Sequence, residues 1–551
     1  MYKGIMKLLI FTVEKFRSIE HVEVRFPDNK PLIFFGPNNA GKSNILKALD
    51  CFLGEKYTTY IDFQDSDYFF RNKEAFPNIR FIGKFDADIY PGNSRSSATN
   101  ELFFTTNIEI NGDIECCYHK RENTTTGQID KIYLTNESRH KCQFILVDAT
   151  RDIERQLSYF SKYSILSKMA KRMHDAIGTS VKEELNNNFT ELKSIFETVP
   201  EYKTFLLNLQ NAFDQNVDGF EHKLEIDLSA YDPNNYFHSL RIVAKEGTEV
   251  RSFDEFGTGE KQILLISFVK AYAETFSDDS FILAVEEPEA HLHPLAQRWF
   301  SNKLNTLTGD NIQVVITTHS PEFLSIDNLE GFVRVYKDAG ITKVIQHTAK
   351  SLADFCISNG APSSKVKESN ILNFYETKTF YDQLKGFFAR KVILVEGDTE
   401  LFALPNYFKN WGYSLLKDGV DIVNCRGKGN ITRNYRLYKA FGYKVYCLFD
   451  ADGKSSSEHN QDLSVTFGFE LAHMNLSNSG FTADSTNGYG YFGKDFETYM
   501  TENISDYRAK ASKVGEEKVL VAKIVSESND YKPMYIEDIA SYFLLAKVED
   551  R

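Results

Sequence analysis

The spacing of hydrophobic and polar residues along the chain predicts an alternation of strands and helices. Short strands are expected at 7–13 and 20–26, and a fully apolar strand at 32–35 leads into a helix over 44–52. From 78 to 134 the chain shows short alternating segments separated by turn residues, which is typical of consecutive strands. The N-terminal part is therefore expected to be rich in strands around one early helix.

A polar stretch with helical periodicity interrupts this region. Residues 157 to about 213 contain few glycines and one proline, so we expect helices that stand apart from a sheet, within an insertion over about 157–235. Such an insertion is suited to dimerisation or to partner contact. A pair of solvated surface helices is the alternative, and periodicity does not separate the two.

Beyond the insertion, strands and helices alternate again. Apolar strands are expected at 281–285 and 312–316, with helices between them, which predicts a mostly parallel sheet covered on both faces. A polar, helical connector follows, and an apolar strand at 391–395 opens a second α/β unit that runs to the C-terminus. The expected division is 1–345, 346–389 and 390–551.

The bulk composition fits a soluble protein of two or three domains. The chain has 551 residues, of which 42% are hydrophobic and 26% charged, and no apolar run approaches the ~20 residues that span a bilayer. Residues 1–11 lack the features of a signal peptide, and seven cysteines without metal-type spacing indicate reduced thiols. We therefore expect a cytoplasmic protein with no membrane partner.

The net charge of −13 argues against a protein that coats nucleic acid, because phosphate binding requires a cationic face. Acidic residues clustered around metal ions would explain part of this balance. A DNA-binding role would then require a local basic groove.

The sequence G-P-N-N-A-G-K-S at 36–43 stands between the apolar strand and the first helix. Gly36 and Gly41 allow a tight turn whose N–H groups point at phosphate oxygens, and the helix N-terminus adds positive charge. Lys42 would reach the β- and γ-phosphates, and Ser43 would supply a hydroxyl to Mg²⁺. The residues expected to contact ATP in this stretch are Gly36, Asn38, Asn39, Gly41, Lys42, Ser43 and Asn44.

Two strand ends and one more glycine turn complete a nucleotide site. Glu286 and Glu287 follow an apolar strand, where the first would hold the Mg²⁺ shell and the second would polarise the attacking water. His319 ends the next strand, where it would contact the γ-phosphate. The second glycine turn precedes a helix and suggests composite sites, in which one protomer's turn caps ATP held by the other. It consists of Gly257, Thr258, Gly259 and Glu260.

Together these motifs resemble the ATPase heads of the ABC class related to RecF and SMC proteins. The motifs are F-R-S-I at 16–19, the P-loop, F-G-T-G-E at 256–260, E-E-P-E at 286–289 and T-H-S at 318–320. The resemblance implies that the glycine turn acts in trans across an ATP-clamped dimer, although Thr258 stands where glycine is common. The glutamine loop of that family stays open between Gln64 and Gln143.

A second pair of strand ends carries acidic residues in the C-terminal part. Glu396 follows the strand at 391–395 and Glu400 lies one helical turn further, whereas Asp450 and Asp452 end another apolar strand. Because sites form at the carboxyl ends of parallel strands, we expect these carboxylates to converge around Mg²⁺ or Mn²⁺. Two such ions about 3.5–4 Å apart can activate water and stabilise the leaving oxygen of a phosphodiester.

This arrangement resembles the Toprim fold, and an ABC-type head followed by Toprim on one chain resembles the OLD (overcoming lysogenisation defect) family of nucleases. The resemblance implies an α/β chain in which an ABC-type P-loop ATPase domain with a helical insertion precedes a Toprim domain. It also implies that Glu497 is an additional metal ligand and that Lys532 stabilises developing phosphate charge. In the glycine turn at 424–430, Arg426 and Lys428 are candidates to meet DNA phosphate.

These features predict an ATP-hydrolysing, metal-dependent DNA endonuclease of antiphage defence or DNA processing. The predicted catalytic residues are Glu287, Glu396, Asp450, Asp452 and Lys532, and the predicted metal ligands are Ser43, Glu286, Glu396, Glu400, Asp450, Asp452 and Glu497. The expected partners are DNA, a second copy in a homodimer or larger even-numbered oligomer, and a defence-system partner such as a helicase, a reverse transcriptase or a structured RNA.

The alternative is an SMC-like or RecF-like DNA clamp or sensor whose Toprim domain binds without cutting. Four carboxylates without metal would repel phosphate, which argues against it. A Toprim topoisomerase would also need a nucleophilic tyrosine in a separate DNA-gate domain, for which the chain has no room.

Overall fold

The computed structural model describes residues 6–54, 57–89, 98–121, 128–135, 138, 141–147, 177–196, 198–216, 243–246, 249–252, 255–275, 280–290, 292–309, 311–515, 517–528 and 531–547. The chain forms two compact units. The first contains Met1–Leu146 and Asp278–Arg551, and the second contains Val147–Ser277.

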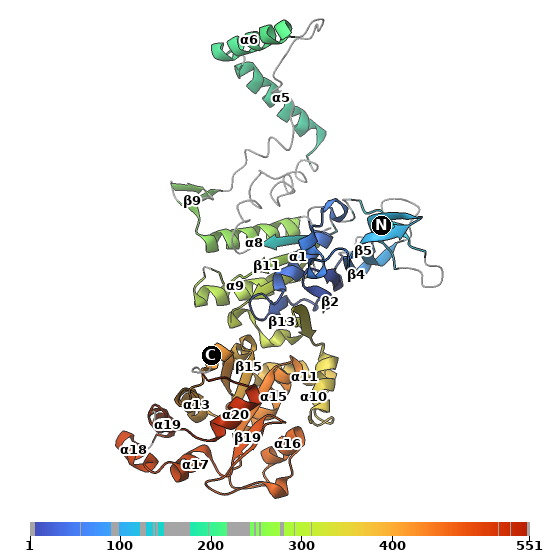
Figure 1. Ribbon diagram of the computed structural model, residues 1–551. Helices are drawn as coiled ribbons and strands as arrows, with labels where there is room; N and C mark the ends of the chain where they lie inside the picture. Colours follow the sequence, from blue (N-terminus) through green and yellow to red (C-terminus); the bar gives the residue numbers. More distant parts are fainter. Residues whose placement is uncertain are drawn as a thin grey trace. The chain divides into compact units, whose positions relative to one another are not determined.

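A sheet of 12 strands organises the larger part of the first unit, as far as its residues are described (Figure 1). Its order is β7-β6-β5-β4-β1-β2-β14-β13-β3-β12-β11-β8. From β7 to β2 neighbouring strands are antiparallel, whereas β13, β3, β12 and β11 run parallel. The strands are β1 (Leu8–Phe16), β2 (Ile19–Arg25), β3 (Leu32–Phe35), β4 (Arg80–Ile89), β5 (Thr99–Ile110), β6 (Asp113–His119), β7 (Lys131–Ile132), β8 (Cys142–Val147), β11 (Ser280–Glu286), β12 (Ile312–Thr318), β13 (Phe332–Asp338) and β14 (Ile341–Gln346).

The parallel half carries the nucleotide motifs at the carboxyl ends of its strands. β3 and β12 are buried at every position, which explains why both read as continuous apolar runs. The turn after β3 leads into α1 (Lys42–Leu53), whose Ile45, Leu46 and Leu49 are buried in the same core as the sheet. The helix α9 (Pro294–Leu307) connects β11 to β12. The predicted strand–turn–helix order is confirmed.

The antiparallel half corresponds to the alternating segments of the sequence. The predicted strands at 7–13 and 20–26 form β1 and β2, and the segments between 78 and 134 form β4 to β7. Aromatic rings fill this part of the core: the ring of Phe81 stacks on that of Phe104 at 5.7 Å and meets that of Phe16 edge-on at 5.4 Å.

A second sheet, of five strands, forms the C-terminal region of the first unit. Its order is β16-β15-β17-β19-β18, and only β18 runs antiparallel to its neighbour among these described strands. The strands are β15 (Lys391–Val395), β16 (Val420–Asn424), β17 (Lys444–Asp450), β18 (Phe481–Asp484) and β19 (Tyr489–Phe492). The helices are α13 (Asp398–Asn410), α14 (Leu415–Asp418), α15 (Ile431–Ala440), α16 (Glu458–Phe467), α17 (Phe496–Asn503), α18 (Tyr507–Val514), α19 (Lys518–Ser526) and α20 (Tyr535–Phe543). The predicted α/β class is confirmed.

The connector between the two sheets is packed within the same unit. The Arg334 side chain of β13 donates to the backbone oxygen of Phe441 at 2.6 Å. The ring of Phe35, the last residue of β3, lies 5.6 Å from that of Phe387 and 6.2 Å from that of Phe441. The connector helices are α10 (Ala349–Ser358), α11 (Glu368–Lys378) and α12 (Tyr381–Lys385).

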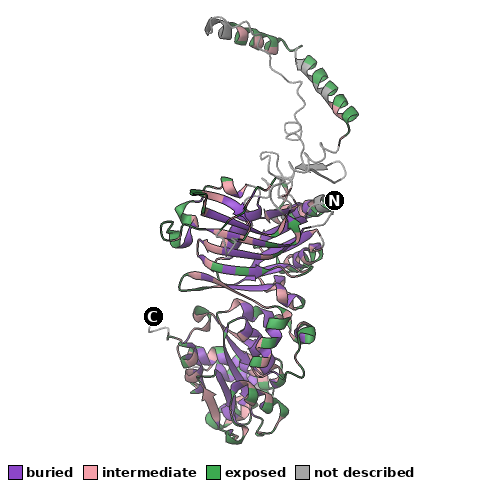
Figure 2. Ribbon diagram, turned by 90° about the vertical axis from the view of Figure 1, so that its right-hand side faces the viewer, coloured by how far each residue is buried: buried purple, intermediate pink, exposed green. Residues whose placement is uncertain are grey.

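The second unit contains the predicted helical insertion in part. Two helices, α5 and α6, are described there, and most of their described side chains are exposed (Figure 2). The remainder of the predicted insertion, 157–176 and 217–235, lies outside the described residues, and its use in dimerisation stays a prediction. The elements of this unit are α5 (Thr179–Phe196), α6 (Pro200–Asn216), β9 (Val243–Glu246), β10 (Glu249–Ser252) and α8 (Thr258–Thr275).

Across the described parts of both units, we find no helix with the length and apolarity that crossing a membrane requires.

Candidate functional site

The P-loop turn depends on two glycines with left-handed backbone angles. Gly36 has a φ of +143°, and a Cβ there would lie 2.0 Å from the backbone oxygen of Val335. Gly41 has a φ of +108°, and a Cβ there would lie 2.1 Å from Thr342 Oγ1. Both positions therefore require glycine, for conformation and for space.

Lys42 folds back over this turn at the start of α1. Its Nζ donates to the backbone oxygens of Gly36 at 3.0 Å and Pro37 at 3.1 Å, and the residue is only 6% exposed. Burial lowers the pKa of Lys42 to about 8, against the opposing effect of three nearby glutamates, Glu287, Glu289 and Glu286. The ammonium group thus lies in a desolvated position that an anion would complete.

The strand order brings the other predicted ATP-site residues to the same edge of the sheet. The Ser43 hydroxyl donates to Glu286 Oε1, although 243 positions separate the two in sequence. Glu287 follows with a φ of +47°, and its Oε1 lies 3.6 Å from His319 Nε2. The two predicted magnesium ligands, Ser43 and Glu286, are therefore side by side, as are Glu287 and the predicted γ-phosphate contact, His319.

Glu289 orders the end of β12, a role that the sequence did not suggest. Its two carboxylate oxygens accept from the Thr318 hydroxyl, at 2.8 Å, and from the backbone N–H of His319. Burial lowers the pKa of His319, and the charge of Lys42 adds to this effect, so the imidazole is favoured in its neutral form. Glu289 is the third acidic residue of the E-E-P-E motif, and its position there could have suggested this role.

Three residues predicted to contact ATP, all asparagines, lie next to protein groups outside the phosphate-binding turn or at its exposed tip. The Asn44 side chain donates to Ser18 Oγ at 2.8 Å and accepts from Arg17 at 3.4 Å, so it joins α1 to the F-R-S-I turn. Asn38 and Asn39 are exposed at the tip of the loop, where the latter accepts from a lysine of β13. Their contact with nucleotide stays a prediction.

The predicted signature turn lies in the second unit. Its Glu260 caps its own helix, α8, because the carboxylate accepts from the backbone N–H of Gly257 at 2.8 Å. Gly259 and Thr258 follow Gly257 in the first turn of α8. Closure of a partner's ATP site by this turn stays a prediction.

The acidic residues of the C-terminal sheet gather where β15 and β17 end side by side. These two strands are parallel neighbours, so Glu396, directly after β15, and Asp450, the last residue of β17, meet at one edge. The backbone N–H of Asp450 donates to Glu396 Oε2 at 3.3 Å. One Asp450 oxygen accepts from the backbone N–H of Phe496 at 3.0 Å, which brings the start of α17 to the same place.

Two further carboxylates complete this cluster. Glu400, in the first turn of α13, is 3% exposed, and burial raises its pKa to about 7, with added repulsion from Glu396 and Glu497. Burial also raises the pKa of Asp450 well above its usual value, and repulsion from the other three glutamates adds to this shift. Glu497 accepts from the Thr399 hydroxyl at 3.2 Å. At neutral pH, repulsion and burial favour the protonated form of several of these carboxyl groups. A bound cation would favour their charged form instead.

The oxygen-only donor set fits a hard divalent cation such as Mg²⁺ or Mn²⁺. In the part of the chain that the structure describes, no three acidic, histidine or cysteine side chains already stand in a ready-made ligand arrangement. The carboxylates of Glu396, Glu400 and Asp450 are the ones that would hold such an ion.

Asp452 has a different surrounding from the other predicted ligands. Its φ is +58°, and its Oδ2 accepts from Lys428 Nζ at 2.8 Å. The Lys428 side chain is 4% exposed, whereas that of Asp452 is 56% exposed. A buried lysine is therefore part of the acidic site, where the sequence had suggested only a contact with DNA phosphate.

Comparison with known families assigns both halves of the first unit. A family model described as AAA ATPase domain matches residues 6–324, more than half of the chain. The chain belongs to the AAA ATPase domain family. A second model, the TOPRIM domain of overcoming-lysogenization-defect-like proteins, matches residues 387–452. The resemblance that the motifs suggested, an ATPase head joined to an OLD-type TOPRIM domain, is confirmed.

Three relatives share much of this AAA ATPase–TOPRIM chain. It is 23% identical over 450 residues to the OLD nuclease of Thermus scotoductus, which covers 80% of this chain and 81% of the relative. It is 26% identical over 306 residues to the Old nuclease of Escherichia phage P2, covering 52% and 50% of the two chains. It is 20% identical over 464 residues to the endonuclease GajA of Bacillus cereus, covering 72% and 67%.

The predicted catalytic residue Lys532 has surroundings of its own, and its role in catalysis stays a prediction. The loop that holds Lys532 is fixed to the C-terminal end of α13, because Trp411 Nε1 donates to Pro533 O at 2.8 Å and Lys532 Nζ lies 6.0 Å from the Trp411 ring. Glu400 lies eleven residues earlier on the same helix, about 16 Å along its axis. Lys532 is therefore placed away from the acidic cluster, and Lys428 is the lysine that the fold brings there.

A groove of about 780 Å³ opens beside Glu396 in the TOPRIM domain. Its basic side chains, Lys385 and Arg426, both pair with Asp382, at 3.1 and 3.2 Å. The guanidinium of Arg426 also lies 4.2 Å from the centre of the Phe380 ring. The groove is lined by Asp382, Lys385, Glu396, Gly397, Asp398, Leu401, Asp421, Ile422, Val423, Asn424, Arg426 and Gly427.

The two candidates for the glutamine loop of the AAA ATPase domain have different surroundings. Gln143 is buried within β8, whereas Gln64 is exposed and its amide donates to Asp62 Oδ2 at 2.8 Å. Gln64 precedes a short 3₁₀ helix whose Asp67 holds Arg17 at 2.9 Å.

Proposed function

We propose that this chain is an ATP-hydrolysing, divalent-metal-dependent DNA endonuclease that acts as an effector of antiphage defence. The observation that carries the proposal is the cluster of Glu396, Glu400, Asp450 and Glu497. The pKa of the first three carboxyl groups is raised, and Glu396 and Asp450 lie at adjacent strand ends. Such a cluster suits cations that act on a phosphodiester. The names of the relatives, which include nucleases and an endonuclease, agree with that chemistry.

In the TOPRIM domain, Asp450 and Glu396 would be the principal ligands of Mg²⁺ or Mn²⁺, with Glu400 and Glu497 beside them. The bound ion supplies an activated water and neutralises charge on the phosphate. Lys428 holds Asp452 in place and offers a fixed positive charge next to the cluster. The adjoining groove, which Arg426 and Lys385 line, would accept a DNA strand, and these two side chains would contact its phosphates.

In the AAA ATPase domain, the P-loop N–H groups and Lys42 would bind the phosphates of ATP, while Ser43 and Glu286 would hold Mg²⁺. Glu287 would orient the attacking water, and neutral His319 would contact the γ-phosphate. The turn from Gly257 to Glu260 would complete the site of a second copy, which makes a homodimer or a larger even-numbered oligomer the working form. Cytoplasmic location and a defence-system partner belong to the same proposal.

Plasmid cleavage by the full chain tests the proposal. We expect supercoiled DNA to be cut with Mg²⁺ or Mn²⁺ and left intact with a chelator, in the presence and absence of ATP. DNA binding without cutting under every metal condition would contradict the nuclease assignment and would favour the clamp or sensor.

A further inference from the structure

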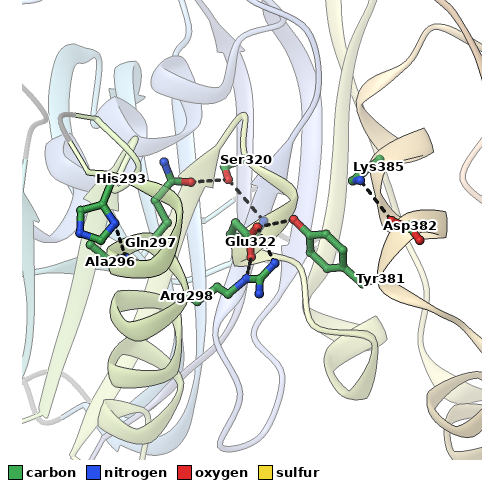
Figure 3. A network of polar contacts seen from close by, with 9 residues as sticks. All are labelled: His293, Ala296, Gln297, Arg298, Ser320, Glu322, Tyr381, Asp382 and Lys385. Atoms are coloured by element: carbon green, nitrogen blue, oxygen red, sulfur yellow. Dashed lines mark hydrogen bonds and ion pairs between the residues drawn. The ribbon is translucent and has the colours of Figure 1, made fainter.

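A three-residue junction joins the segment after β12 to the connector helix α12, with a half-buried carboxylate at its centre and an exposed arginine, Arg298, on one side (Figure 3). At its centre is Glu322, whose side chain is 11% exposed. Arg298, on α9, donates to Glu322 through Nε at 2.8 Å and through Nη2 at 3.4 Å. The Tyr381 hydroxyl, at the start of α12, donates to the same carboxylate.

On one side the junction is connected to the nucleotide site by a short, rigid segment. Glu322 lies three residues after His319, in a 3₁₀ helix, Pro321–Phe323, that Ser320 caps. The Ser320 hydroxyl accepts from the backbone N–H of Glu322 at 3.3 Å and donates to Gln297 at 2.7 Å (Figure 3). A shift of His319 on binding or losing a γ-phosphate would therefore be passed to Glu322 rather than absorbed by a flexible loop.

On the other side the junction is connected to the TOPRIM groove. Tyr381 is followed by Asp382, which pairs with Lys385 and Arg426, and both Asp382 and Lys385 line the groove beside Glu396. The next residue, Gln383, is buried and donates to the backbone oxygen of Asn424 at the end of β16. The helix α12 is thus a wall of the groove, held at one end by Glu322.

This junction is built around an ion pair rather than around apolar contacts. A partly buried ion pair seldom adds stability over an apolar contact, but it fixes one geometry. The guanidinium of Arg298 lies 5.3 Å from the Tyr381 ring centre, and the Lys385 ammonium lies 5.4 Å from the same centre. The orientation of Tyr381 is therefore determined from both directions.

We propose that Glu322, with Arg298 and Tyr381, couples the nucleotide state at His319 to the position of α12 and so to the DNA groove beside Glu396. Glu322 is a positioning residue in this scheme and touches neither ATP nor DNA. The inference rests on the proposed nuclease function for its consequence, but the coupling itself is measurable without DNA.

The first test uses Tyr381→Phe, which removes the hydroxyl and keeps the ring. We expect ATP hydrolysis and nucleotide-free DNA cleavage to stay within about twofold of wild type, since neither active site is touched. In wild type, a non-hydrolysable ATP analogue should change the cleavage rate. In Tyr381→Phe, the ratio of the rates with and without the analogue should be closer to one, by about fivefold or more. Tyr60→Phe is the matched control, because Tyr60 is 76% exposed and lies far from the junction in sequence, and it should leave the ratio unchanged.

The second test measures hydrogen–deuterium exchange of the peptide over 379–390 with and without the same analogue. Wild type should show a nucleotide-dependent change there, and both Tyr381→Phe and Glu322→Gln should lose it while still binding the analogue. An unchanged response in both variants would overturn the coupling. Loss of the response in a chain that cuts no DNA would support the coupling and refute only the nuclease.

Discussion

The two candidate sites of the first unit use the same architecture for opposite charges. Both lie where neighbouring parallel strands end, and both combine acidic residues with one buried lysine. At the P-loop, the buried Lys42 ammonium lies over a glycine-bearing turn. At the TOPRIM edge, the carboxyl groups of Glu400 and Asp450 are buried close to other carboxylates.

Burial shifts the titrating groups of the two sites in opposite directions. It lowers the pKa of Lys42, which favours the uncharged amine, and it raises the pKa of Asp450, which favours the uncharged acid. A phosphate would reverse the first effect and a divalent ion the second. The ligands proposed for the two sites are therefore opposite in charge.

Among the variants, Asp450→Asn should separate the activities of the two sites most strongly. We expect DNA cleavage to fall by at least about 10³-fold, because the ion loses a principal ligand, while ATP hydrolysis stays within about twofold. Without metal, the variant should unfold at a higher temperature than wild type, since a repulsive buried carboxyl is gone. Added Mn²⁺ should stabilise wild type and leave the variant unchanged.

Asp354→Asn serves as the matched control, because Asp354 is exposed on α10, away from the carboxyl ends of the strands. It should match wild type in cleavage, ATP hydrolysis and thermal response to Mn²⁺. Cleavage that persists in Asp450→Asn would remove the TOPRIM edge from the reaction.

The reciprocal variant is Lys42→Ala. We expect ATP hydrolysis to fall by about 10²–10³-fold, because Lys42 is the cation that would neutralise the phosphate charge in a site that also contains Glu286, Glu287 and Glu289. Metal-dependent cleavage without nucleotide should remain. Lys47→Ala, on the exposed face of the same helix, removes only an ion pair with Asp50 and should leave hydrolysis unchanged. Hydrolysis at the wild-type rate in Lys42→Ala would refute the P-loop site.

The sequence was sufficient to predict the strands on which both candidate sites are built, because each site depends on apolar strands that end in short motifs. The strands before Gly36, Glu286, Glu396 and Asp450 all form, and their parallel pairing makes distant motifs neighbours. Parallel pairing follows from the alternation of strands and helices, which is visible in the sequence.

The sequence was insufficient where loops decide which side chains meet. Lys428 and Asp452 are 24 residues apart, and only the packing of the turn after β16 brings them together. The same holds for Lys532, which a loop fixes at the far end of α13. Nor does any local pattern reveal that β14 lies next to β2 and so joins the antiparallel and parallel halves into one sheet.

A comparison of two lysines sharpens the composition of the TOPRIM site. We expect Lys428→Ala to reduce cleavage by about 10–100-fold, because Asp452 loses the partner that holds it. Lys532→Ala should change cleavage by less than about threefold, since its ammonium lies over Trp411 at the other end of α13. Initial rates on plasmid DNA at saturating Mg²⁺ decide between them, and the reverse order would restore Lys532 to the site.

The smallest predicted effect is a pH dependence of ATP affinity. The pKa of Lys42 is lowered to about 8 in the ATP-free protein, and bound phosphates favour the ammonium form, so binding takes up a proton above that pH. The dissociation constant should be flat below about pH 7 and rise by at most about tenfold per pH unit above pH 8. Lys42→Arg keeps its charge throughout and should show no such rise.

Calorimetry in buffers of different ionisation enthalpy measures this proton uptake directly. The stability of the ATP-free protein should rise with pH, whereas ATP affinity falls. A lysine whose pKa is lowered in the folded state weakens that state most when it is charged. That penalty is largest below pH 8 and is relieved as the pH rises toward the usual lysine value of 10.5. Equal ATP affinity at pH 7 and pH 9.5 would mean that Lys42 stays charged without phosphate, and the contrast between the two sites would then rest on the TOPRIM carboxylates alone.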